Sequence, residues 1–249
     1  MSALILALSA GAVVGLALGA LGGGGSVLAV PALIYLLGFT PAAATTASLI
    51  IVTATSLTAL YAHARAGNVR WKAGAAFAAA GLLPAALAGA AAARLPQTAL
   101  TVAFAAIAAL AAARMLRPAR TADAASDGVR PVKAAGAGAG LGALTGLLGV
   151  GGGFLAVPAL VTVLAFDMQA AVGTSLLVIT ANSLASLATR SGSAVSLDWA
   201  VIGPFIAAAV LGAWDGKRLS SKVSGPRLQR VFAVALLAVA AFMLADAVA

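Results

Sequence analysis

Two runs of glycine are the residues in this sequence best suited to bind a small ligand. Four consecutive glycines should end a helix, because glycine costs about 1 kcal/mol relative to alanine inside one. The helix that starts after such a break has unpaired N–H groups and a partial positive charge, which together bind anions. We predict this site at two runs, with Pro31 and Pro158 fixing the helix breaks. The runs comprise Gly22, Gly23, Gly24, Gly25 and Ser26, and Gly149, Gly151, Gly152 and Gly153.

Other glycines recur at every fourth position and have a simpler explanation. Small residues at this spacing let two membrane helices approach closely. Helix packing therefore accounts for Gly11, Gly15, Gly19, Gly138, Gly142 and Gly146. It accounts poorly for the consecutive glycines.

Uncharged polar residues on two apolar segments are further candidate ligands. Thr45, Ser48 and Thr55 share one helix face, and so do Ser175, Asn182 and Ser186. Hydroxyl and amide groups can replace the water around a small anion without placing a charge in lipid. We predict that the binding shell is completed by Ser48, Thr55, Thr174, Ser175 and Asn182. Hydrogen bonding between helices is an equally good explanation of the stripe.

Ionisable residues suggest little further chemistry. We expect His63, the single histidine, to be solvated beside Arg65 rather than to act as a proton relay. Asp215 should pair locally with Lys217 and Arg218. No carboxylate lies in the middle of an apolar segment, glutamate is absent, and so is cysteine, which argues against a cation carrier and a metal-dependent membrane enzyme. We predict no catalytic residue, metal or cofactor.

The composition shows that lipid is the main solvent of this chain. Of its 249 residues, 63% are hydrophobic and 8% are charged, and the mean hydropathy is +1.10. Soluble domains have about 45–50% apolar and about 25% charged residues. The net charge of +9 is expected to orient the chain in a bilayer rather than to bind nucleic acid. The expected partners are lipid and a small anionic substrate, and a homo-oligomer is compatible with the sequence.

The elements that must position these residues are ten apolar segments. A helix crosses the hydrocarbon core with about 20 residues. Six segments reach this length, at 42–62, 73–93, 98–116, 169–189, 199–216 and 228–248. The others, at 3–21, 26–38, 134–149 and 153–166, form two regions that are either re-entrant hairpins or pairs of crossings. Continuous runs rich in alanine and leucine favour helices over a β-barrel. The predicted fold is an all-α polytopic membrane protein.

The two halves of the chain are copies of each other at an offset of 127 residues. Residues 11–56 match 138–183 at 23 of 46 positions, and Leu28–Leu33 is repeated as Leu155–Leu160. The basic residues decide the relative orientation, since Lys and Arg gather in cytoplasmic loops. Three clusters lie on one predicted side and hold 13 of the 15 basic residues, whereas Arg94 and Arg190 lie on the other.

This distribution predicts two inverted-topology repeats. They span 1–116 and 134–249 and are joined by a cytoplasmic linker at 117–133. Each contains a glycine-broken helix or re-entrant hairpin followed by three transmembrane helices, and both termini are periplasmic. Inverted repeats with broken helices are typical of secondary transporters.

The duplicated motifs resemble those of the TauE/SafE sulfite exporter family, also called the toluene-sulfonate uptake permease family. The resemblance covers essentially the whole chain. It is carried by Gly22–Ser26 leading into Val30–Leu33, the copy at Gly149–Leu160, Gly173–Leu176 with its counterpart Thr46–Leu49, and the turns Gly67–Trp71 and Ser196–Trp199. The first copy departs from the pattern at Thr46-Ala47, where the second has Gly173-Thr174. The resemblance implies a bacterial inner-membrane carrier for sulfite, sulfoacetate or related organosulfonates.

The combined hypothesis is a secondary transporter that exports small sulfur-containing anions by alternating access. Two alternatives remain open at this stage. An anion channel would use the same donors without switching between two states, and a membrane scaffold protein would use the polar stripe only for packing. A cation carrier ranks third.

Overall fold

The structure is a computed structural model that describes residues 2–92, 96–116, 131–148, 153–190 and 197–248. These residues form ten α-helices and one short π-helix. In chain order they are α1 (Ser2–Leu21), α2 (Gly24–Pro31), η1 (Ala32–Leu36), α3 (Pro41–Arg65), α4 (Trp71–Ala92), α5 (Gln97–Leu116), α6 (Pro131–Leu148), α7 (Gly153–Thr162), α8 (Met168–Arg190), α9 (Trp199–Lys222) and α10 (Gly225–Val248). Each predicted apolar segment is therefore helical, which confirms the all-α prediction.

Six of the described helices are long and apolar enough to cross a membrane. Five of them, α3, α4, α8, α9 and α10, coincide with predicted spans, and α1 is the sixth. With 20 residues, α1 extends for about 30 Å and matches the thickness of the hydrocarbon core. In contrast, α2 has 8 residues and η1 has 5, so together they are too short to cross alone.

The first helix break lies at Gly22 and not at the proline. Gly22 has a φ of +71°, a left-handed conformation that a helix cannot contain. Pro31 has φ −56° and ψ −41°, which are helical values, and the chain continues directly into η1. Pro158 likewise lies inside α7. Neither proline therefore interrupts its helix, although the π-helix η1 begins directly after Pro31, where proline lacks a backbone donor. A role of these prolines in fixing the breaks stays a prediction. The second break, at 149–152, lies outside the described residues.

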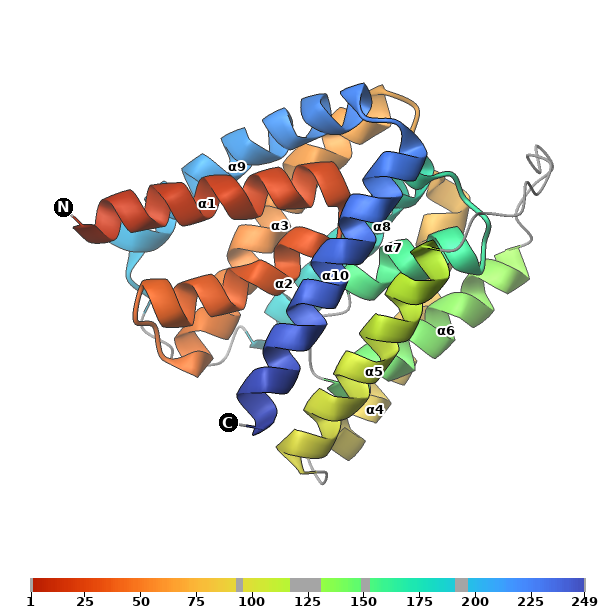
Figure 1. The fold of residues 1–249 in the computed structure, drawn as a ribbon, viewed down its shortest axis with the longest axis horizontal. Helices are drawn as coiled ribbons and strands as arrows, with labels where there is room; N and C mark the ends of the chain where they lie inside the picture. Colours follow the sequence, from red (N-terminus) through yellow and green to blue (C-terminus); the bar gives the residue numbers. More distant parts are fainter. Residues whose placement is uncertain (1, 93–95, 117–130, 149–152, 191–196, 249) are drawn as a thin grey trace.

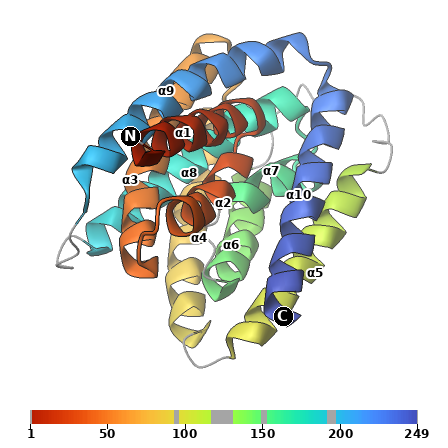
Figure 2. The same cartoon turned by 60° about the vertical axis from the view of Figure 1, so that its left-hand side comes forward.

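The long helices pair with partners distant in sequence. Figures 1 and 2 show α1 alongside α9 and α5 alongside α10, and α4 packs on α6. Glycines let two of these pairs approach closely. In the α1–α9 pair, a Cβ on Gly15 would lie 1.9 Å from the carbonyl oxygen of Ala209. In the α4–α6 pair, a Cβ on Gly142 would lie 2.1 Å from the carbonyl oxygen of Gly81. The packing explanation is confirmed at Gly11, Gly15, Gly19, Gly138 and Gly142.

The helices that carry the predicted polar stripes form the centre of the molecule. In both α3 and α8, 61% of the candidate span is buried, compared with 28% to 44% in the other candidate spans. The two helices pack on each other, α2 contacts α3, and α7 contacts α8. The short helices also contact each other. The two broken regions thus converge on the α3–α8 pair.

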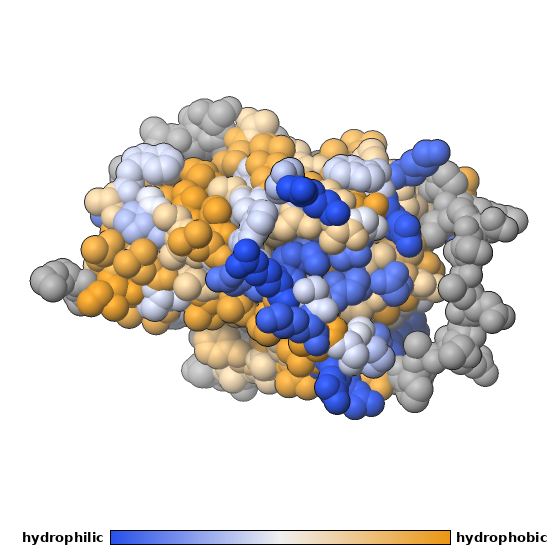
Figure 3. Space-filling model, turned by 90° about the horizontal axis from the view of Figure 1, so that it is seen from above, coloured by the Kyte–Doolittle hydropathy of each residue, from blue (hydrophilic) through white to orange (hydrophobic). Residues whose placement is uncertain are grey.

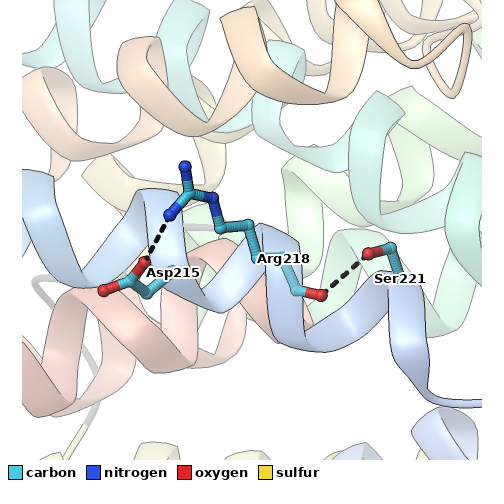
Figure 4. A network of polar contacts seen from close by, with 3 residues as sticks. All are labelled: Asp215, Arg218 and Ser221. Carbon is cyan, nitrogen blue, oxygen red and sulfur yellow. Dashed lines mark hydrogen bonds and ion pairs between the residues drawn. The ribbon is translucent and has the colours of Figure 1, made fainter.

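Hydrophilic side chains gather on part of one face of the molecule. In the view from above in Figure 3 they lie in the middle and on the right, on the side of the turn between α9 and α10, whereas the left is mostly hydrophobic. Arg218, Lys222 and Arg227 are exposed near this turn. The predicted local pairing of Asp215 is confirmed with Arg218, at 3.5 Å between Oδ1 and the guanidinium (Figure 4). Both side chains are exposed, so this ion pair adds little stability.

Candidate functional site

Gly22 brings the first helix break into contact with α8. A Cβ on Gly22 would lie 2.5 Å from the Ser175 hydroxyl and 3.2 Å from the Val157 side chain of α7. Gly22 and Ser175 are both buried. Ser175 is seven residues from the first residue of α8, or about 10 Å along the helix. Two predicted site residues from different halves of the chain therefore meet inside the span.

Three of the predicted hydroxyl ligands are buried, and each of these donates to a carbonyl of its own helix. Ser48 is 5% exposed, and Thr55 and Ser175 are fully buried. Ser48 donates to the Thr45 carbonyl at 2.8 Å, Ser175 to that of Val172 at 2.8 Å, and Thr55 to that of Ile51 at 2.7 Å. These bonds satisfy the hydroxyls without a ligand. Rotation about the Cα–Cβ bond would redirect the hydroxyls toward an anion.

Thr174 joins the start of α8 to the turn before α4. Its hydroxyl oxygen accepts a hydrogen bond from the Arg70 backbone N–H at 3.0 Å. The neighbouring Gly173 allows this approach, since a Cβ there would lie 2.4 Å from the Asn68 carbonyl oxygen. Two of the family-like motifs, Gly67–Trp71 and Gly173–Leu176, thus pack against each other.

Asn182 has an unsatisfied polar atom. Its Oδ1 is buried and has no hydrogen-bond partner in the described part of the chain. Nearby in sequence, the Thr180 hydroxyl bonds to the Ser56 hydroxyl at 2.9 Å and so links α8 to α3. Ser56 and Thr180 are not among the site residues predicted from the sequence, although both belong to the repeated block. Their pairing depends on how the two helices cross, which spacing along one helix cannot reveal.

Some of the remaining predicted site residues lie in the described part of the chain and others do not. Gly23 is buried and precedes α2, which begins at Gly24 and includes Gly25 and Ser26. Gly153 is the first residue of α7. Gly149, Gly151 and Gly152 lie outside the described residues.

His63 is buried, contrary to the expectation that it is solvated. It is 0% exposed, and its Nε2 lies 3.1 Å from the Gly19 carbonyl oxygen in the last turn of α1. Its Nδ1 is buried without a hydrogen-bond partner among the described residues. The physical reason is that α1 and α9 pack over the end of α3 and cover the ring. A residue near the end of a helix is solvated only if no other helix covers that end.

The fold and this interior define a class of protein. Six described helices can cross a membrane, and the buried polar side chains of the described ranges are hydroxyls and one histidine. No cluster of three metal-ligating side chains lies within those ranges. The molecule is a multi-pass helical membrane protein with a largely uncharged polar interior.

Comparison with known proteins identifies its family. Residues 7–243 match the family model described as sulfite exporter TauE/SafE. The chain is similar to a probable membrane transporter protein of Xylella fastidiosa strain 9a5c, with 33% identity over 97% of this chain and 95% of the relative. It is 32% identical to a protein of the same name from strain Temecula1, with the same coverage. No solved structure matches the chain. The chain belongs to the TauE/SafE family and is a membrane transporter, not an enzyme.

Proposed function

We propose that this protein is a secondary transporter that exports sulfite, sulfoacetate or related organosulfonates across the bacterial inner membrane. The observation that carries the proposal is the contact of Gly22 with Ser175 inside a chain of this family. It joins the helix break that precedes α2 to a buried hydroxyl from the other half of the chain, and the first N–H groups of a helix lack partners within that helix. Such donors bind an anion without a permanent charge in lipid.

The proposed binding shell combines both kinds of donor. Backbone N–H groups of the half-helices that start within Gly22–Ser26 and Gly149–Gly153 would hold the anion's oxygens, and side chains would complete the shell; the N–H of Gly22 itself donates to the Leu18 carbonyl at 2.8 Å. These side chains are Ser48, Thr55, Thr174, Ser175 and Asn182. Because no carboxylate lies in the middle of an apolar segment, we propose that the substrate gradient, or a proton carried by sulfite itself, drives transport.

Alternating access would rest on two inverted repeats, 1–116 and 134–249. The glycine contacts support this division. Gly11 and Gly138 are repeat-related, and a Cβ on them would meet the carbonyl oxygens of Phe205 and Phe77, at 2.4 Å and 2.1 Å. Each half thus places its first helix against the fourth α-helix of the other half, α1 against α9 and α6 against α4. Two equivalent halves, each with its first helix packed on the other half, can move as rigid bodies relative to each other around a site between them.

The carrier and channel hypotheses differ in one measurable property. A carrier preloaded with substrate exchanges it, so unlabelled sulfite inside proteoliposomes accelerates uptake of labelled sulfite. We expect this counterflow, with saturation in sulfite concentration. Flux that neither saturates nor responds to preloading would replace the carrier with a channel.

The site is tested by removing two hydroxyls at once. We expect the double variant Ser48→Ala, Ser175→Ala to lower sulfite counterflow at least about tenfold, because each hydrogen bond to a charged group contributes about 1.5–3 kcal/mol. The matched control is Ser9→Ala, Ser221→Ala, which also removes two hydroxyls that donate to carbonyls three residues earlier, but on exposed surfaces. Full counterflow in the site variant would indicate that the stripe only packs helices, as a scaffold protein requires.

The substrate class is tested by binding. Purified protein should show a higher melting temperature with sulfite, sulfoacetate, thiosulfate or taurine, since a ligand stabilises the state it binds. Stabilisation by divalent cations alone would overturn the anion proposal.

A further inference from the structure

His63 is a buried polar residue that the proposed transport cycle does not use. Its ring lies where α1, α3 and α9 meet, with no exposed surface. The Nε2 atom lies 3.1 Å from the Gly19 carbonyl oxygen. A carbonyl can only accept a hydrogen bond, so this nitrogen carries the proton and donates.

This hydrogen bond acts on the last turn of α1. The final carbonyls of a helix lack intrahelical partners, and a side chain from another element can satisfy them. Gly19 is two residues from the end of α1 and three residues before the break at Gly22. Gly22 in turn touches Ser175. A continuous path of one helical turn therefore joins His63 to the proposed site.

The ionisable groups near the ring are basic. Lys217 of α9 acts electrostatically on His63, and Arg65 lies two residues further along α3. The described part of α1 has no ionisable side chain. Among the described residues, Nδ1 has no hydrogen-bond partner, so the contact of Nε2 with Gly19 is the one that can fix the ring.

We propose that His63 is a positioning residue for the substrate site: its Nε2–H holds the last turn of α1 and so places Gly22 and the start of α2 against Ser175. This inference rests on the proposed anion site, and it gives His63 a role through backbone geometry rather than through proton transfer. This role requires only that the side chain at position 63 place one hydrogen-bond donor where Nε2 lies.

Two amide variants separate donor geometry from other properties of histidine. In His63→Gln the amide nitrogen reaches the position of Nε2, whereas in His63→Asn it is one methylene short. A third variant, His63→Leu, keeps the volume but has no donor. The control is Ser220→Ala, which removes a fully buried hydroxyl at the same end of the molecule whose bond, to the Lys217 carbonyl, stays within α9.

The first readout needs no substrate. The chain has no cysteine, so Ser175→Cys provides one thiol beneath Gly22. A small methanethiosulfonate converts this thiol to a mixed disulfide and releases methanesulfinate, and the rate of this modification reports opening of the contact. We expect the modification to accelerate about fivefold when His63→Asn or His63→Leu is added, which corresponds to the loss of one net hydrogen bond. His63→Gln and Ser220→Ala should leave the rate unchanged. Equal rates in all backgrounds would overturn the proposal.

The second readout is sulfite counterflow with Ser175 intact. We expect His63→Asn and His63→Leu to raise KM about fivefold with little change in maximal rate, and His63→Gln to restore KM. The pH profile of His63→Gln should match that of the unmodified protein. A flattened profile would show that His63 titrates and would replace positioning with proton transfer. If the unmodified protein moves no sulfite at all but the thiol-modification rates differ as expected, the anion substrate is wrong and the positioning role stands.

Discussion

At the scale of single residues, Gly22 combines two requirements that only glycine meets. Its φ of +71° is in the left-handed region, and its missing Cβ leaves room for the Ser175 hydroxyl. Gly38 and Gly67 have similar φ values of +69° and +73°, but a Cβ on either would meet nothing within 4 Å. All three positions would strain the backbone of any other residue, but only at Gly22 would a side chain also meet neighbouring atoms.

We predict that Gly22→Ala destabilises the protein more than Gly38→Ala or Gly67→Ala. All three variants incur a left-handed alanine, at roughly 1–2 kcal/mol, and Gly22→Ala adds an overpacking cost of about 1–3 kcal/mol. Thermal unfolding in detergent measures the difference. Adding Ser175→Ala removes the nearest clashing atom and should recover part of the stability. Equal losses in the three single variants would show that the contact with Ser175 does not matter.

At the scale of elements, the helix pairs α1–α9 and α4–α6 depend on glycine at particular positions. Backbone atoms are the obstacles at these contacts, so the helices must separate if a Cβ is added. Two glycines of α6, Gly142 and Gly140, differ in whether a Cβ would meet a neighbouring helix. A Cβ on Gly142 would be 2.1 Å from the Gly81 carbonyl oxygen, whereas a Cβ on Gly140 would meet nothing within 4 Å.

We predict opposite effects from two alanine substitutions in α6. Gly142→Ala should lower the melting temperature through a loss of about 1–3 kcal/mol. Gly140→Ala should raise it through a gain of up to about 1 kcal/mol, because alanine favours the helix. Differential scanning fluorimetry of both variants in one detergent tests this. A higher melting temperature for Gly142→Ala would contradict the close α4–α6 contact.

At the scale of the whole molecule, the basic residues should orient the protein in the membrane. The exposed cluster at the α9–α10 turn is predicted to be cytoplasmic, with both termini periplasmic. Because native cysteine is absent, single cysteines report this directly. On intact cells, an impermeant maleimide should label Ser2→Cys but label Arg218→Cys only after permeabilisation. Labelling of Arg218→Cys on intact cells would reverse the orientation, and equal protection of both would disprove the periplasmic amino terminus.

Sequence patterns alone determined the lipid solvent, the positions of the helices and the break at the first glycine run. These properties are local, since hydrophobic length, helix propensity and glycine content act within a few residues of the chain. Thus segment 169–189 was predicted within one residue of α8. Patterns also marked Gly15 and Gly142 as packing residues without identifying what they pack against.

Only the tertiary structure decided which helices meet. Gly15 contacts Ala209, Gly22 contacts Ser175, and Ser56 bonds to Thr180, and each pair is separated by more than 100 residues in sequence. Such contacts depend on the rotation and crossing of whole helices, which periodicity along one helix does not specify. For the same reason His63 was expected in solvent: its burial results from α1 and α9, which cover the end of α3 from the opposite ends of the chain.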